Sequence, residues 1–120
     1  MPATLTIFLH QLRFFAYHGL YPEERKTGND FEVNLSVSYT APEEIITDLS
    51  AIINYERLFA LLQEQMQIPR GLLETLAMEI AETIHSVFPG IKSLDISITK
   101  LYAPITTFTG HVGVRYYREY

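Results

Sequence analysis

The stretch Asp30-Phe31-Glu32-Val33-Asn34-Leu35-Ser36-Val37-Ser38-Tyr39-Thr40 decides the fold. Apolar and polar side chains alternate along its whole length, which is the pattern of a β-strand with one apolar face and one polar face. The following Ala41-Pro42 ends the strand. A strand of this length is a liability at the edge of a sheet, because its free backbone groups can pair with another chain.

Three more strands and two helices are predicted around this segment. Residues 92–100 alternate in the same way, while residues 4–16 and 111–119 are rich in β-branched and aromatic side chains. One helix is predicted to begin after Asn54, a residue type common at helix N-caps, and a second to end at Pro89-Gly90. Their apolar stripes are Tyr55, Leu58, Phe59, Leu62 and Met66, and then Leu73, Leu76, Ala77, Ile80, Ile84 and Val87.

The element order is therefore ββααββ, and it predicts one α+β domain over residues 1–120. A four-stranded antiparallel sheet with both helices on one face buries all the apolar stripes together. The other face of the sheet would be polar, lined by small side chains such as Asn34, Ser36, Ser97 and Thr99. Pairing of strand edges between subunits would close such sheets into a β-barrel ring, so we expect a homo-oligomer.

Composition excludes several classes of protein. The 120 residues contain no cysteine, which excludes disulfides and zinc thiolates, and the net charge of −5 argues against a nucleic-acid scaffold. No apolar run is long enough to span a bilayer, and the first residues do not form a signal peptide, so a cytoplasmic protein without membrane contact is expected. The four histidines do not have the sequence spacing of metal ligands, so no metal site is predicted. No cofactor is predicted either.

A long loop, residues 17–28, lies between the first two predicted strands. It contains aromatic side chains, His18, four consecutive charges and a glycine near each end. Elaborate loops on a rigid sheet are common places for functional sites, but a solvated connection would account for the same residues. His18 is expected to order the turn, and Gly19 and Gly28 to provide the bends that place Glu24.

Four polar residues lie at the ends of predicted elements, where active sites are commonly built. They are Glu24, Tyr55, Glu74 and Lys100. Each also has an ordinary structural explanation. Glu24 and Lys100 would serve as solvated charges, Tyr55 as a core aromatic residue with a solvated hydroxyl, and Glu74 as a partner of the helix dipole.

The chain resembles the dihydroneopterin aldolases of the bacterial folate pathway over nearly its whole length. The segments that carry the resemblance are Phe15–Gly19, Pro22–Gly28, Ile53-Asn54-Tyr55, Leu72–Ala77, Thr99-Lys100, Ala103-Pro104-Ile105 and Val112-Gly113-Val114. The resemblance implies the tunnelling fold, in which ββααββ subunits form a tetrameric β-barrel that often stacks into an octamer. It also implies active sites between adjacent subunits and a retro-aldol cleavage of a pterin, 7,8-dihydroneopterin, to 6-hydroxymethyl-7,8-dihydropterin and glycolaldehyde.

Carried over residue by residue, the resemblance implies a role for each candidate. Glu74 would anchor the pterin through two parallel hydrogen bonds, with Leu73 beside it offering backbone contacts. Lys100 would be the acid–base residue, and Tyr55 would help to protonate the enamine-like intermediate.

The remaining carried-over residues would line the site. Glu24 is expected near Lys100 and the diol tail of the substrate. Leu20 and Ile53 would add backbone or wall contacts.

Two positions depart from the family pattern, and two other functions stay open. Ala51-Ile52 stands where the family often has Asp-Thr, and Leu101-Tyr102 follows Lys100 where many members have proline. The closest alternative is a dihydroneopterin (or dihydroneopterin triphosphate) 2′-epimerase, which would use the same residues. A non-catalytic pterin-binding ring is an alternative of another class.

Overall fold

The computed structural model describes residues 2–105 and 107–120. Its elements confirm the predicted ββααββ order and add two short helices. In chain order they are β1 (Thr4–Ala16), α1 (Pro22–Thr27), β2 (Asn29–Thr40), the 3₁₀ turn η1 (Leu49–Ala51), α2 (Tyr55–Met66), α3 (Leu73–Val87), β3 (Ser93–Lys100) and β4 (Val112–Glu119).

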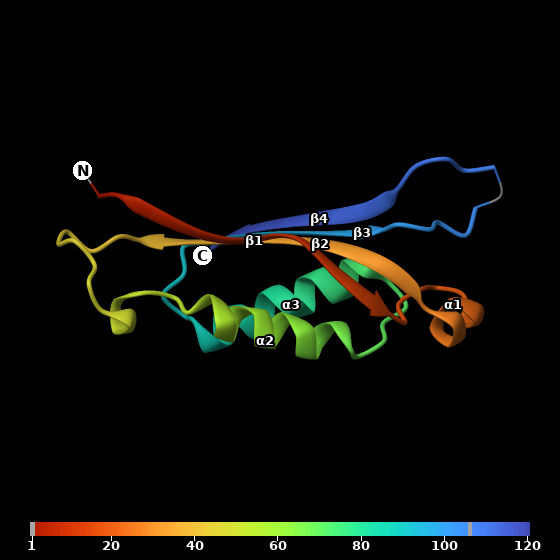
Figure 1. Cartoon of the computed structure of the whole chain (residues 1–120), viewed down its shortest axis with the longest axis horizontal. Helices are drawn as coiled ribbons and strands as arrows, with labels where there is room; N and C mark the ends of the chain where they lie inside the picture. The colour runs from red at the N-terminus through yellow and green to blue at the C-terminus, as the bar shows by residue number, and fades with distance from the viewer. Residues whose placement is uncertain (1, 106) are drawn as a thin grey trace.

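The four strands form one antiparallel sheet in the order β1-β2-β3-β4. Figure 1 shows α2 and α3 side by side beneath this sheet, with α1 at one end of it. The predicted α+β class is therefore confirmed. The association of residues 30–40 with a sheet edge is wrong, because β2 lies between β1 and β3 and the free edges belong to β1 and β4.

The core lies between the sheet and the two long helices. The apolar side chains of β2 and β3 that face the helices are fully or almost fully buried, as the alternating pattern predicts. They pack against the buried stripes of the helices, which are Leu58, Leu61, Leu62 and Met66 of α2 and Leu76, Ala77, Ile80, Ala81 and Ile84 of α3. Asn54 caps α2 as predicted, since its Oδ1 accepts a hydrogen bond from the Glu56 N–H at 2.8 Å.

A β-bulge in β1 changes which side chains of the strand face the core. Ile7 and Leu9 face the core before the bulge, and Leu12 and Phe14 face it after, so the alternation changes from odd to even positions. The pairing shifts between Leu9 and Leu12, and Gln11 adopts a positive φ of 58°. The extra backbone N–H of Gln11 is satisfied by Oδ1 of Asn34 at 2.8 Å.

Replacing Ile96 of β3 by alanine is expected to destabilise the fold much more than replacing its neighbour. Ile96 is 0% exposed, so Ile96→Ala should reduce the free energy of unfolding by about 2–5 kcal/mol through lost burial and a residual cavity. Ser97 faces away from the helices, and Ser97→Ala should change this energy by about 0.5 kcal/mol or less. Urea unfolding at one protein concentration measures both; equal effects would contradict the assignment of the two faces.

Candidate active site

Lys100 and Glu24 form an ion pair at one end of the sheet. Lys100 is the last residue of β3 and, unlike most lysines, is only 7% exposed. Its Nζ donates a hydrogen bond to Oε2 of Glu24, which comes from α1, 76 residues earlier in the chain. The two side chains are 9% and 10% exposed, so the pair is largely removed from water. The structure thus brings together two of the predicted site residues.

Two glycines fit the loop around Glu24. A Cβ on Gly19 would lie 2.5 Å from Cβ and Cδ of Glu24, so only glycine lets the carboxylate lie against the backbone there. Gly28 follows α1 with a positive φ of 76°, and its N–H donates to the carbonyl of Glu24 at 3.0 Å. The predicted bend is confirmed at Gly28, whereas Gly19 acts through close approach rather than through a positive φ.

The short helix α1 was not predicted from the sequence. Pro22 occupies its first turn, and Oε1 of Glu24 accepts a hydrogen bond from the Tyr21 N–H at 3.3 Å, as in a capping box. Six mostly charged residues show no apolar periodicity, so the available signal was the proline followed by acidic residues. Glu24 therefore lies in a hydrogen-bonded helical turn and not in an irregular loop.

His18 is completely buried and uses both ring nitrogens. Nδ1 accepts a hydrogen bond from the Arg70 N–H at 3.1 Å, so Nε2 carries the proton and donates it to the Met66 carbonyl at 2.8 Å. Burial lowers the pKa of His18; the bond to Met66 acts in the opposite direction, and the charges of Arg70 and Lys100 lower the pKa further. His18 orders the turn, as predicted.

The connector between α2 and α3, residues 67–72, lies against this loop. The Gly19 N–H donates to the Arg70 carbonyl at 3.0 Å, and Gly71 comes close to the Gly19 carbonyl. The connector leads directly into Leu73 and Glu74 in the first turn of α3. Glu74 is exposed at the same end of the molecule as the ion pair, as is Leu20, which is 62% exposed.

Tyr55 and Ile53 lie at the opposite end of α2. Its last residue, Met66, is bonded to His18, while Tyr55 is its first residue and is 58% exposed. A helix of 12 residues is about 18 Å long, so one chain does not bring Tyr55 to the ion pair. Figure 1 shows this separation along α2. The predicted site is therefore divided within a single chain.

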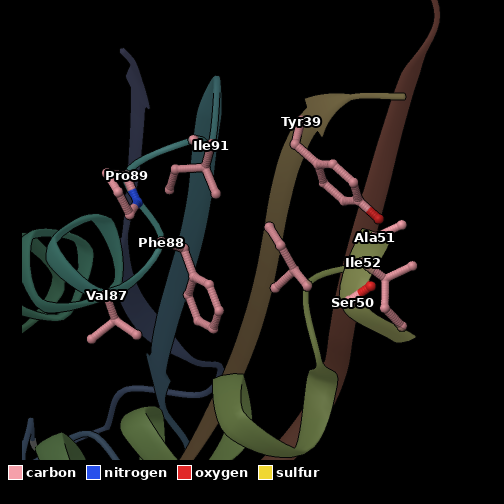
Figure 2. Close-up of a pocket in the computed structure, with 10 residues that line it drawn as sticks. Tyr39, Ser50, Ala51, Ile52, Val87, Phe88, Pro89 and Ile91 are labelled. Atoms are coloured by element: carbon pink, nitrogen blue, oxygen red, sulfur yellow. The ribbon is translucent and has the colours of Figure 1, made fainter. Parts of the chain in front are cut away.

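A cavity of about 290 Å³ lies at this second end of the molecule. Figure 2 shows Val87, Phe88 and Ile91 on one side of it and Tyr39 and Ile52 on the other. Ile53 also lines it, but the lining holds no carboxylate, lysine or histidine. The cavity is thus unsuited to acid–base chemistry by its own residues.

Within residues 2–105 and 107–120, no cluster of three or more histidine, cysteine, aspartate or glutamate side chains is arranged to hold a metal ion. Over the same residues, no helix has the length and apolar character required to cross a membrane.

Comparisons with known proteins identify the family of this chain. The family model described as dihydroneopterin aldolase matches residues 7–117. The chain belongs to the dihydroneopterin aldolase family. It is 32% identical to a dihydroneopterin aldolase from Methylorubrum extorquens, over 93% of this chain and 88% of that relative.

Two solved structures share the fold. A Vibrio cholerae protein described as a putative dihydroneopterin aldolase has a TM-score of 0.85 and 23% identity, covering 98% of this chain and 99% of that one. The Escherichia coli dihydroneopterin aldolase, solved in complex with neopterin, has a TM-score of 0.77 and 19% identity, covering 94% and 97%.

The Glu24–Lys100 pair is expected to be more strongly coupled than an exposed ion pair of the same protein. A double-mutant cycle with Glu24→Gln and Lys100→Met should give a coupling energy of about 1–3 kcal/mol, because either single change leaves a buried charged or polar group unpaired.

The matched control is the Asp95–Arg115 pair, in which the arginine side chain is 72% exposed. The cycle with Asp95→Asn and Arg115→Met should give less than about 1 kcal/mol. Urea unfolding of all variants measures both energies, and similar couplings would show that burial does not strengthen the first pair.

Proposed function

We propose that this protein is a 7,8-dihydroneopterin aldolase that produces 6-hydroxymethyl-7,8-dihydropterin and glycolaldehyde for folate synthesis. Membership of the family makes it an enzyme of the lyase class. The observation that carries the proposal is the buried Glu24–Lys100 pair at the same end of the molecule as Glu74. The relative from Methylorubrum extorquens and the neopterin complex of the Escherichia coli structure support the choice of substrate.

The chemistry starts at the C2′ hydroxyl of the substrate tail. Lys100, acting as a base directly or through a water, takes the hydroxyl proton, and the C1′–C2′ bond breaks to release glycolaldehyde. The electron pair of that bond moves into the C=N bond of the pterin ring. This ring acts as the electron sink, so the step requires neither a Schiff base on lysine nor a metal.

The second half of the reaction returns a proton. The enamine-like intermediate takes a proton at C1′, which gives the hydroxymethyl group of the product. We assign this step to Tyr55, either directly or through a water that its hydroxyl orients. Glu24 accepts a hydrogen bond from Lys100, and we assign it to share protons with Lys100 and to contact the diol tail.

The pterin ring is assigned to the start of α3. The Glu74 carboxylate is exposed there and would accept two parallel hydrogen bonds from the ring's amino group and the adjacent N–H. Leu73 would contribute backbone contacts, and Leu20 and Ile53 would form parts of the wall. A paired hydrogen bond of this kind selects rings that carry an amino group beside an N–H.

We further propose that the site is completed by a second copy of the chain. Tyr55 and Ile53 lie at the N-terminal end of α2, a helix about 18 Å long, and the other residues lie beyond its C-terminal end, so a neighbouring subunit would supply Tyr55 and Ile53. The open edges of β1 and β4 and the polar sheet face support a ring of subunits, as a tetramer or a stacked octamer. We take residues 1–120 as one domain, and place the enzyme in the cytoplasm because a chain without cysteine fits a reducing compartment.

Incubation of the purified protein with 7,8-dihydroneopterin and a chelator is expected to release glycolaldehyde. Lys100→Ala should reduce turnover by at least about 100-fold, as expected for loss of an acid–base group, while pterin binding through Glu74 persists. Chromatography of the products also detects the C2′ epimer. Epimer alone would support the 2′-epimerase, and pterin binding without either product would support the non-catalytic ring.

Mixing two inactive variants is expected to restore turnover if the site lies between subunits. Tyr55→Phe and Lys100→Ala each damage one part of the site, and a mixed ring contains some interfaces with both parts intact. The variants are denatured together, refolded and assayed, with each variant refolded alone as the control. A mixture no more active than the variants alone would contradict a shared site.

A further inference from the structure

His18 is a completely buried polar residue to which the proposed reaction assigns no role. A buried histidine usually fills space in a core, but His18 lies between the two segments that carry the proposed site residues. We propose that His18 is a positioning residue for the aldolase reaction: its neutral imidazole ties the loop that carries Glu24 to the α2–α3 connector that leads to Glu74. This inference rests on the function proposed above.

The two hydrogen bonds of His18 join it to both ends of the connector. Nε2 donates to the carbonyl of Met66, the last residue of α2, and Nδ1 accepts from the N–H of Arg70. The ring is held edge-on to Phe31, with 5.4 Å between ring centroids. One tautomer, with the proton on Nε2, satisfies both bonds, and an imidazolium would turn an N–H toward the N–H of Arg70.

The position of His18 is transmitted to Glu24 through Gly19. The Gly19 N–H donates to the Arg70 carbonyl at 3.0 Å, and its own carbonyl accepts from Nη1 of Arg25 at 2.6 Å. The Cα of Gly19 faces the Glu24 side chain closely enough that no Cβ fits between them. A shift of residues 18–19 relative to the connector therefore moves the surface against which the Glu24 carboxylate rests.

The connector is held to its neighbours by several bonds of Arg70, which makes it a suitable anchor. Arg70 Nη1 donates to the carbonyl of Ile68 at 2.8 Å, and Nε lies 3.1 Å from Oε1 of Glu79 on α3. The same residue thus bonds the connector to α3 and the loop to the connector. These bonds fix the position of Glu24 relative to Glu74. The position of Glu74 is also fixed by the packing of the buried stripe of α3.

The charged groups near His18 favour its neutral form. Arg70 and Lys100 both lower the pKa of its imidazole, in addition to burial, while Glu24 is already paired with Lys100. The unfolded chain therefore binds a proton on His18 at a higher pH than the folded chain does. As the pH falls below the ordinary histidine pKa of about 6.5, this difference reduces the free energy of unfolding. At still lower pH, protonation of folded His18 removes the acceptor for the Arg70 N–H.

Three variants separate positioning from space filling. His18→Asn keeps an acceptor for the Arg70 N–H, His18→Gln keeps a donor for the Met66 carbonyl, and His18→Phe fills the space with neither bond. The matched control is His85→Gln, which changes a histidine in the last turn of α3 that stacks on Tyr120, away from the site. Each variant is checked for folding by circular dichroism and urea unfolding before assay.

A positioning role predicts a loss of kcat without a loss of pterin affinity. In folded His18→Phe, kcat for 7,8-dihydroneopterin should fall roughly 10- to 100-fold, because a small misplacement of a reacting group has effects of that size. The dissociation constant of 6-hydroxymethylpterin, held by Glu74, should change less than about threefold, or 0.7 kcal/mol. His18→Asn and His18→Gln should be intermediate, and His85→Gln should match the wild type. Wild-type kcat in folded His18→Phe would overturn the inference, as would equal losses of kcat and affinity.

The pH dependence gives a second, independent readout. The ratio of wild-type kcat to that of His18→Gln should decrease only at a pH below the ordinary histidine pKa of about 6.5, where folded His18, whose pKa is lowered by burial, takes up a proton. A ratio independent of pH would contradict the requirement for the neutral ring. Taking a ratio removes any pH dependence that the two enzymes share.

Nuclear magnetic resonance of the wild type tests the geometry without any substrate. The ¹⁵N shifts of His18 should show a protonated Nε2 and an unprotonated Nδ1 at pH 7, and a protonated Nδ1 would overturn the inference even if no variant folds. If the wild type yields neither glycolaldehyde nor epimer, the proposed function fails, whatever the tautomer. If the wild type is active and folded His18 variants are equally active, the positioning role alone fails.

Discussion

The burial of one lysine is the constraint on which this end of the structure depends. An ammonium group removed from water requires a partner of opposite charge, and Glu24 provides it from a segment far away in the chain. That partner has to be held at a fixed place. The capping contacts of α1 and the close approach of Gly19 lie directly against Glu24, and the proposed role of His18 is to hold Gly19 in that position.

The sheet explains why such a pair forms at the end of a strand. Lys100 continues the alternation of Leu94, Ile96 and Ile98, so its side chain must point to the helix side of the sheet. At that position the long helices no longer cover the strand, and the loop before β2 does so instead. A charged residue in a core register is costly unless it is paired, and Glu24 provides the pair for Lys100.

Local sequence patterns predicted the helices and strands well, but not the order in which the strands pair. The alternation in residues 30–40 and the apolar stripes of both helices are local, and they identified the sheet, the helices and the faces that these bury. Tyr55 is an exception, because it was predicted on the apolar stripe of α2 but is 58% exposed. The central place of β2 is a property of pairing with β1 and β3, so no pattern within the strand reports it. The bulge at Gln11 and the six-residue helix α1 were missed because each occupies too few residues to show a period.

The sequence by itself determined the α+β class, the faces of the sheet and the residue types needed for acid–base chemistry. Family resemblance added which of those residues to consider together. Only the tertiary structure decided that Glu24 contacts Lys100, that His18 joins the loop to the connector, and that Tyr55 lies at the far end of α2. The reason is physical: periodicity reports which side of an element is buried, whereas contacts between distant segments depend on how whole elements pack.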